Sequence, residues 1–343
     1  MAENTLRAAV IGVGMIGTLH ARVYRDDPRT ELVAVVDVNE ERAREVGTEL
    51  GVPWYASVSD MLAQEEIDAV TVATPEQHRY DPAVACARAG KHLLLEKPLA
   101  PTLPEVDRLI LEVEKTGVTT MVNFILRSDP RYVRAKWAMG DGTVGEPCTI
   151  FARRRGTSLG AEVYGPWTDL LISTAIHDLD VMVWLNECAV ERVYAESVVK
   201  RSAEWGREDA VAAVLRFANG AVGLLETSWV LPPNVPAPLD AALEVVGTGG
   251  GVFIEGANHG LAIADSEGYK LPDLANWPAG REGVEGALRA SISAFITSVL
   301  YGEPPVMSLR EARYAQEIVE ALKISIRRGA PVKLPLEGGG QAD

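Results

Sequence analysis

The sequence predicts an α/β chain in which a doubly wound parallel sheet is followed by an α+β domain with a large, mainly antiparallel open sheet. Three observations lead to this prediction. A length of 343 residues exceeds what one core normally organises. Residues 6–125 alternate between short apolar runs and helical segments, which indicates parallel strands with helices on both faces. Later residues form longer strands of alternating polarity. We therefore expect two domains, 1–125 and 126–343.

The strands of the first domain are short runs of β-branched and other apolar residues. They are expected at Ala8–Ile11, Leu32–Asp37, Ala69–Ala73, His92–Glu96 and Thr119–Phe124, with a weaker one near Trp54. The helices between them include Glu40–Leu50, Asp81–Ala89 and Pro104–Thr116. Gly90 and Gly117 end the last two, because glycine readily takes the left-handed conformation that closes a helix.

The second domain contains five strands of alternating polarity. They are expected at Thr149–Arg155, Glu191–Lys200, Ala210–Phe217, Ala221–Trp229 and Leu239–Val246. Asn219-Gly220 predicts a tight hairpin, because such a turn needs positive φ angles. Helices are expected near Ser173–Leu185, Val284–Tyr301 and Leu309–Arg327, and the proline-rich stretch Leu231–Leu239 predicts a loop.

The composition excludes several classes of function. Lys and Arg number 33 against 48 Asp and Glu, so a net charge of −15 disfavours nucleic acid and anionic membranes as partners. We expect neither a secretion signal nor a membrane span, since the chain lacks a basic apolar leader and any apolar run of about 18 residues. Three widely spaced cysteines favour a reducing cytoplasm. Five scattered histidines give no ligand spacing, so no metal is expected.

A glycine-rich motif follows the first strand and opens the first helix. Its members are Gly12, Gly14, Met15, Ile16 and Gly17. Their amides can face a pyrophosphate at the helix N-terminus, as in a Rossmann-type domain. Asp37 ends the second strand, where a carboxylate accepts hydrogen bonds from a ribose 2′-hydroxyl and repels a 2′-phosphate. The pair predicts dinucleotide binding with NAD favoured over NADP. Arg42 is either a phosphate contact that weakens this preference or a solvated helix residue.

Lys97 follows the strand His92–Glu96, at the edge where open α/β sheets bind their ligands. Taken alone, it could be a solvated charge. Pro98 comes next, and a cis Lys-Pro bond would fix the direction of the lysine side chain.

At this point the sequence resembles the Gfo/Idh/MocA family, the dehydrogenases related to glucose-fructose oxidoreductase and myo-inositol dehydrogenase. Five stretches carry the likeness. They are AAVIGVGMIGTLHA (8–21), VATPEQHRYDPAVACARAGKHLLLEKPLA (72–100), STAIHDLDVMVWL (173–185), FANGAVGLLETSWVLP (217–232) and SLREARYAQEIVEALKISIRRGAPVKLP (308–335). The resemblance implies NAD(P)-dependent oxidation of a hydroxyl on a sugar, inositol or similar polyol. It also implies a Rossmann domain joined to an open sheet used for oligomerisation.

Carried onto this chain, the catalytic lysine of the family matches Lys97 and its catalytic histidine matches His177. A base must take the hydroxyl proton while hydride leaves, and histidine suits this because its pKa is ordinarily about 6.5. Lysine more readily donates a hydrogen bond to the reacting oxygen. Asp180, three residues after His177, either orients the imidazole or holds a substrate hydroxyl, although a packing role fits it nearly as well.

One position departs from the family. Many relatives carry Asp four residues before the histidine, where this chain has Ser173. Without that carboxylate, less stabilisation of the imidazolium is expected, which shifts more of the proton work to Lys97. Asp169 lies four residues earlier, and the sequence leaves open whether it compensates.

Several further residues are expected to line the same site. Those expected near the cofactor are Thr74, Pro75, His78 and Glu96, besides Lys97 itself. Those expected near the substrate are Arg127, Arg153, Tyr164, Trp167 and Ser173, besides His177. Aromatic rings and arginines suit a polyol, but packing explains each of them as well.

Three functions remain open from the sequence. The first is an NAD-dependent dehydrogenase of a sugar, inositol or sugar derivative. The second is an enzyme, such as one that cleaves glycosides, in which NAD stays bound and is used transiently. The third is a non-catalytic NAD-binding regulator, for which loss of Lys97 or His177 would have been the mark. A homodimer or homotetramer is expected by analogy, through a sheet face left free.

Overall fold

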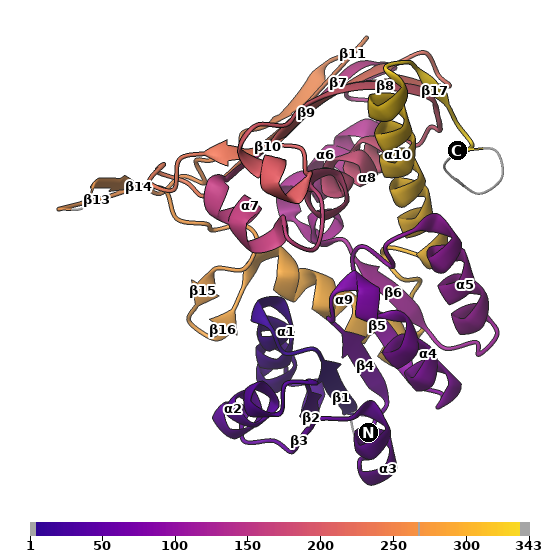
Figure 1. Ribbon diagram of the computed structural model, residues 1–343, viewed down its shortest axis with the longest axis vertical. Helices are drawn as coiled ribbons and strands as arrows, with labels where there is room; N and C mark the ends of the chain where they lie inside the picture. Colours follow the sequence, from indigo (N-terminus) through magenta and orange to yellow (C-terminus); the bar gives the residue numbers. More distant parts are fainter. Residues whose placement is uncertain (1–4, 267, 337–343) are drawn as a thin grey trace. The chain divides into compact units, whose positions relative to one another are not determined.

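The computed structural model describes residues 5–266 and 268–336, which form two compact units (Figure 1). Unit 1 comprises residues 1–129 and 275–313, and unit 2 comprises 130–274 and 314–343. The expected division at 125/126 is therefore incomplete, because the segment 275–313 returns to the first unit.

Unit 1 is built on a six-stranded parallel sheet in the order β3-β2-β1-β4-β5-β6. Its strands are β1 (Leu6–Ile11), β2 (Thr30–Val36), β3 (Trp54–Tyr55), β4 (Ala69–Val72), β5 (His92–Glu96) and β6 (Thr120–Asn123). The order reverses between β1 and β4, where doubly wound sheets bind their ligands beyond the carboxyl ends of the strands. All six expected strands are confirmed, including the weak one at Trp54.

The helices of unit 1 connect these strands. They are α1 (Met15–Asp26), α2 (Glu40–Leu50), α3 (Val58–Gln64), α4 (Tyr80–Arg88), α5 (Leu103–Glu114) and the short 3₁₀ helices η1 (Glu76–His78) and η2 (Ile125–Ser128). Asn39 caps α2 by accepting a hydrogen bond from the Arg42 amide at 3.2 Å. A capping box between Thr102 and Glu105 starts α5.

Helix α9 (Gly286–Tyr301) explains why the later segment belongs to unit 1. Leu288, Ile292 and Phe295 are fully buried in one hydrophobic cluster with residues of β1 and α1. The helix is apolar over most of its surface, so it is stable only where neighbours cover it. The sequence predicted this helix within 126–343, and the structure packs it with unit 1. Packing partners that are distant in sequence leave no local signal.

Unit 2 is built on a seven-stranded mixed sheet in the order β12-β11-β7-β10-β9-β8-β17. Its strands are β7 (Pro147–Thr157), β8 (Val190–Val198), β9 (Ala210–Phe217), β10 (Val222–Leu231), β11 (Leu239–Gly247), β12 (Gly251–Ile254) and β17 (Val332–Lys333). Every pair is antiparallel except β7 with β10. The hairpin at Asn219-Gly220 is confirmed, with φ of +90° at Gly220.

The helices of unit 2 cover one face of this sheet. They include α6 (Pro130–Gly140), α7 (Ser158–Tyr164), the π-helix η3 (Leu171–Ala175), α8 (Ile176–Asn186) and the portion of α10 (Leu309–Arg328) that follows residue 313. Met182 of α8 packs against Gly223 of β10, where an added Cβ would lie 2.6 Å from its methyl group. The described part of the chain contains no helix that is both long and apolar enough for a membrane span.

Candidate active site

The glycine loop between β1 and α1 shows why three glycines are needed. A Cβ on Gly12, whose φ is +84°, would lie 2.8 Å from the Thr74 amide nitrogen. A Cβ on Gly17 would lie 1.8 Å from the Gly12 carbonyl oxygen. A Cβ on Gly14 would meet nothing within 4 Å. Gly12 and Gly17 therefore let strand and helix approach closely, while Gly14 leaves open space at the helix N-terminus. This geometry suits a pyrophosphate.

Asp37 lies beside this loop, immediately after β2. Its Oδ2 accepts a hydrogen bond from the Val13 amide at 3.0 Å, and its Oδ1 accepts one from the Asn39 amide at 2.9 Å. Each carboxylate oxygen can accept further hydrogen bonds. The structure thus fixes a negative charge next to the glycine loop, where it fits the two hydroxyls of a ribose and opposes a 2′-phosphate.

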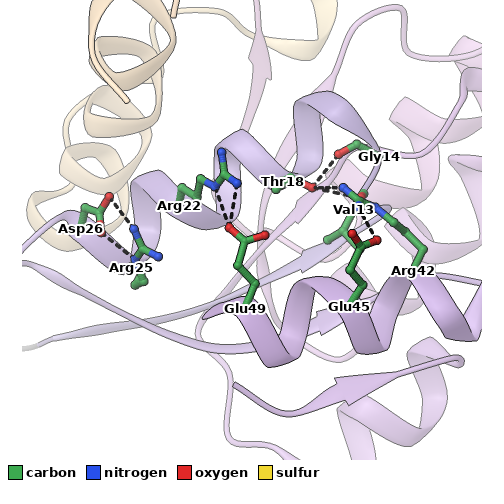
Figure 2. Close-up of polar contacts among 9 residues, drawn as sticks. All are labelled: Val13, Gly14, Thr18, Arg22, Arg25, Asp26, Arg42, Glu45 and Glu49. Atoms are coloured by element: carbon green, nitrogen blue, oxygen red, sulfur yellow. Dashed lines mark hydrogen bonds and ion pairs between the residues drawn. The ribbon is translucent and has the colours of Figure 1, made fainter. Parts of the chain in front are cut away.

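The Arg42 side chain reaches from α2 to the glycine loop (Figure 2). Its Nε donates to the Val13 carbonyl at 2.8 Å, and Nη2 donates to Thr18 Oγ1 at 2.9 Å. The third nitrogen, Nη1, pairs with Glu45 at 2.6 Å. All three nitrogens therefore have acceptors within the protein, although Nη1 and Nη2 each carry a second N–H group. In the structure, the Arg42 side chain connects α2 to the glycine loop through hydrogen bonds. A contact between Arg42 and a cofactor phosphate remains a prediction.

The segment after β4 passes close to the loop. Besides the contact of the Thr74 backbone with Gly12, Thr74 Oγ1 is buried and makes no hydrogen bond within the described residues. A buried hydroxyl is normally satisfied, so this atom fits a site that a ligand completes. Pro75 and His78 are both exposed. Next to His78, Arg79 is almost fully buried, and burial lowers the pKa of its guanidinium to about 10.

Lys97 follows β5 at the same edge of the sheet as the glycine loop, and it is partly buried. The Lys97-Pro98 bond is cis, as hypothesised. The preceding Glu96 is buried, with both carboxylate oxygens bonded within unit 1. Oε1 lies 3.1 Å from His20 Nε2, and Oε2 accepts from the Lys97 amide at 3.2 Å. Glu96 therefore contacts the Lys97 backbone and His20 within unit 1. The expected contact of Glu96 with the cofactor remains a prediction.

Arg127, in η2, is buried in unit 1. Its Nη1 donates to the Val306 carbonyl at 3.1 Å and pairs with Glu311 at 2.6 Å. This nitrogen holds the segment before α10 against the end of β6. Substrate binding by Arg127 remains a prediction.

In unit 2, His177 is the second residue of α8 and is partly buried. The preceding turn, which carries Ser173, is the π-helix η3. Single π-helical turns within helices often accompany functional sites, because they turn side chains out of regular register. Ser173 Oγ lies 3.2 Å from Thr174 Oγ1, which accepts a hydrogen bond from the Trp229 indole at 2.9 Å.

Three acidic residues accompany this helix. Asp169 accepts a hydrogen bond from the Ile172 amide at 2.9 Å and pairs with Lys323 at 2.7 Å, so its carboxylate starts the helix. Asp178 forms a buried, two-bond pair with Arg154 of β7, at 2.7 and 3.0 Å. Asp180 is also buried. Both carboxylate oxygens of Asp169 thus have partners other than His177, namely the Ile172 amide and Lys323.

The expected aromatic residues gather near η3. The rings of Tyr164 and Trp167 meet edge to face with their centroids 5.7 Å apart, and Tyr164 lies 6.2 Å from Trp229. Trp229 in turn bonds Thr174, next to Ser173. Burial raises the pKa of Tyr164, so its hydroxyl stays protonated at neutral pH. Their contact with substrate remains a prediction.

Arg153 lies elsewhere than expected. Its neighbour Arg154 points from β7 to Asp178 of α8, and adjacent strand residues face opposite sides of a sheet. Arg153 therefore points away from α8 and pairs with Asp240 of β11 at 2.9 Å. This placement argues against joint binding of substrate by Arg153 and His177, because the sheet separates them.

The expectation that this chain binds no metal remains a prediction. Among residues 5–266 and 268–336, no group of three His, Cys, Asp or Glu side chains is arranged to bind a metal ion.

Comparison with known protein families decides the identity. Residues 6–124 match the Gfo/Idh/MocA model described as "Oxidoreductase family, NAD-binding Rossmann fold". Residues 165–334 match the model described as "Oxidoreductase family, C-terminal alpha/beta domain". The chain belongs to this family. As a Gfo/Idh/MocA oxidoreductase, it uses NAD. The space at Gly14 and the carboxylate of Asp37 suit this cofactor, and their contact with it remains a prediction.

Individual members of the Gfo/Idh/MocA family match over almost the whole length. Myo-inositol 2-dehydrogenase of Thermotoga maritima is 30% identical over 335 residues, which is 96% of this chain and 98% of the relative. Scyllo-inositol 2-dehydrogenase (NAD(+)) of Bacillus subtilis is 29% identical, with 98% of each chain covered. A crystal structure of a probable dehydrogenase from Thermotoga maritima superposes with a TM-score of 0.82 at 29% identity, covering 96% of this chain and 99% of the other.

Sequence reasoning missed the buried polar residues around Lys97. His20 lies one turn beyond the family's glycine motif, Asn123 ends β6 and Ser291 belongs to α9, which is distant in sequence from both. The sequence analysis expected His78 near the cofactor and did not single out the buried Arg79. A polar residue within an apolar run was the only available signal, and it does not reveal which polar residues meet.

Proposed function

We propose that this oxidoreductase oxidises a ring hydroxyl of an inositol or a closely related cyclic polyol, with hydride passing to NAD. One observation carries the proposal. Lys97 follows β5 at the strand edge that also presents the glycine loop, in a chain whose full-length relatives include inositol 2-dehydrogenases. When bound, NAD supplies the hydride acceptor.

Lys97 and His177 divide the work on the hydroxyl in this proposal. The Lys97 ammonium donates a hydrogen bond to the reacting oxygen, which stabilises the negative charge that develops as the proton leaves. His177 accepts that proton, because a neutral imidazole is a competent base near neutral pH. Lys97 belongs to unit 1 and His177 to unit 2.

Ser173 modifies this division. It brings no negative charge to the turn before His177, and the nearby Asp169 carboxylate is taken by Lys323 and the Ile172 amide. The imidazolium is therefore less stabilised than beside a carboxylate. We expect the activity to depend on His177 less than on Lys97, and Ser173→Asp to increase the dependence on His177.

The test is a screen for NADH formation, followed by its near-ultraviolet absorbance, with myo-inositol, scyllo-inositol, aldoses and anhydrosugars. NAD⁺ and NADP⁺ are compared in parallel. Saturable NADH formation with an inositol supports the proposal. Tight NAD binding without turnover of any polyol would refute it and favour a regulator, whereas turnover of a glycoside without net NADH would favour transient use of bound NAD.

We also propose that copies of this chain associate through the open face of the unit 2 sheet, as a homodimer or homotetramer. In-register residues of neighbouring strands share a face, and one row crosses six strands on the side opposite α8. That row is Phe253, Glu244, Phe151, Leu224, Val214 and Tyr194. Phe253 is 64% exposed and Leu224 41% exposed, which is unusual for residues of this kind in a sheet.

Light scattering during gel filtration tests this association. Leu224→Glu places a charge in the centre of the row and should shift the mass to that of one chain. Leu111→Glu, at an exposed position of α5, is the control and should leave the mass unchanged. A single-chain mass for the unaltered protein would refute the proposal.

We also propose that the protein resides in a reducing compartment such as the cytoplasm. It is supported by the three cysteines, Cys86, Cys148 and Cys188, all of which are free thiols. Thiol titration of protein purified without reductant should find three free thiols, and a disulfide would contradict it.

A further inference from the structure

A buried polar cluster lies directly behind Lys97, at the carboxyl end of β5. Its members come from four elements: His20 of α1, Glu96 of β5, Asn123 of β6 and Ser291 of α9. None is more than 9% exposed. All four belong to unit 1, and nothing in the reaction described above uses them.

The hydrogen bonds of this cluster converge on one carboxylate. Glu96 Oε1 lies 3.1 Å from His20 Nε2 and accepts from Asn123 Nδ2 at 2.6 Å. Ser291 donates to Asn123 Oδ1 at 2.7 Å, which orients the amide so that its NH₂ group faces Glu96. An ionised carboxylate only accepts, so His20 Nε2 carries the proton that it donates. The other oxygen, Oε2, accepts from the Lys97 amide at 3.2 Å.

These contacts keep the carboxylate charged in a buried place. Burial by itself raises the pKa of Glu96, but the hydrogen bonds from His20 and Asn123 and the charge of Lys97 outweigh burial and leave it lowered. The charged or titratable groups that face Glu96 within the described residues are His20, Lys97 and Arg79. A buried charge is costly unless it is paired and hydrogen-bonded.

We propose that Glu96 is a positioning residue for Lys97, held in place by His20, Asn123 and Ser291. The proposal rests on the proposed role of Lys97. The carboxylate fixes the lysine backbone through Oε2, and its negative charge interacts with the charge of Lys97. Since Gly14 of the glycine loop is the N-cap of α1, His20 also connects this loop to the strand end that carries the lysine. The same helix therefore supports both the cofactor and the residue that acts on the substrate.

The first test compares three variants of α1. His20→Leu removes the donor to Glu96, whereas His20→Gln places an amide donor near the position of Nε2. Tyr24→Phe is the matched control, because it removes another fully buried hydrogen bond of α1, the 2.9 Å contact with Thr71 Oγ1. We expect His20→Leu to lower kcat by about tenfold to a hundredfold, because small displacements of a catalytic group have effects of that size. NAD affinity should stay within about twofold.

His20→Gln should recover most of the lost kcat, and Tyr24→Phe should keep the kcat of the unaltered enzyme. A purely structural role predicts another pattern, in which His20→Leu and Tyr24→Phe lose activity alike or in which NAD affinity falls in step with kcat. Either result would overturn the proposal, as would unchanged kcat in His20→Leu.

The second test needs no turnover. The reactivity of the Lys97 amine toward acetic anhydride is followed against pH in the cofactor-free protein, by mass spectrometry of the peptide. Glu96→Gln removes the neighbouring negative charge, so the midpoint should move to lower pH by about one unit. An unchanged midpoint, in a variant that still binds NAD, would overturn the proposal.

Lys97→Met in the same assays separates this inference from the proposed function. If Lys97→Met keeps full turnover, the role of Lys97 fails and the proposed function with it. If Lys97→Met abolishes turnover while His20→Leu and Glu96→Gln leave kcat unchanged, the inference alone fails.

Discussion

Two glycines of the same loop should respond to alanine in opposite ways. An alanine Cβ at position 17 would lie 1.8 Å from the Gly12 carbonyl oxygen, and such contacts are not observed below 3.0 Å. The two atoms have to separate by about 1.2 Å, in a loop whose neighbour Ala73 would also be 3.3 Å from the new methyl group. Such overpacking costs about 3 kcal/mol, at the upper end of its usual range.

At position 14 the added methyl group meets no protein atom within 4 Å. The backbone there has φ −64° and ψ −159°, which alanine adopts without strain. Gly14→Ala should therefore change the free energy of unfolding by no more than about 0.5 kcal/mol. Its methyl group would occupy the space that we assign to the pyrophosphate, so the Kd for NAD should rise about tenfold or more, equivalent to about 1.4 kcal/mol.

Thermal unfolding and calorimetric titration with NAD measure both effects. Gly17→Ala should lower Tm by about 6 °C or more, and Gly14→Ala should leave Tm unchanged while weakening NAD binding. If Gly14→Ala binds NAD as tightly as the unaltered protein, the loop is not the pyrophosphate site and the reasoning is wrong. If Gly17→Ala keeps its Tm, the close approach of strand and helix is wrong.

Three further predictions concern single charged groups. Asp37→Ser should weaken NAD binding and raise the ratio of NADP to NAD affinity by about tenfold or more, because it removes a charge that opposes the 2′-phosphate; an unchanged ratio in paired titrations would contradict this. Arg154→Met should cost about 3–5 kcal/mol in urea unfolding, because Asp178 stays buried without its partner; a loss below about 1 kcal/mol would show that solvent reaches the carboxylate. Burial opposes ionisation of Asp209, yet hydrogen bonds from Ser202 and nearby amides hold its pKa below the usual value, so it stabilises the fold above about pH 4 and this contribution is lost as pH falls through the lowered pKa. Asp209→Asn should therefore be less stable at neutral pH, with a difference that shrinks toward about pH 3; a constant difference would contradict the assignment.

The fold could be predicted where local pattern and global packing agree. The parallel strands are short apolar runs that alternate with helices, two of which are followed by glycines with positive φ, Gly90 and Gly117. The hairpin at Asn219-Gly220 likewise follows from a turn that needs positive φ. The placement of α9 could not be predicted, because its apolar surface indicates that the helix is buried but does not indicate against which sheet it packs. The parallel pairing of β7 with β10 likewise depends on a long connection that the sequence does not describe.

The candidate site was likewise only partly predictable from the sequence. The glycine loop, Asp37 and Lys97 were predictable, because each is tied to a strand end whose position follows from the topology. The side-chain directions of Arg42 and Arg153 were not, because sequence spacing does not tell which acceptor a long flexible side chain reaches. The cluster behind Lys97 was also beyond prediction, since it joins residues as far apart as His20 and Ser291.

Direct transfer of hydride from an inositol carbon to NAD is the central claim, and deuterium tests it most directly. Myo-inositol and scyllo-inositol, each deuterated at the ring carbons, are incubated with NAD⁺ and the enzyme, and the released NADH is examined by mass spectrometry. We predict NADH that carries one deuterium, formed more slowly than from unlabelled substrate, and none in Lys97→Met. If neither inositol transfers deuterium to NADH while NAD still binds, direct hydride transfer from an inositol is contradicted.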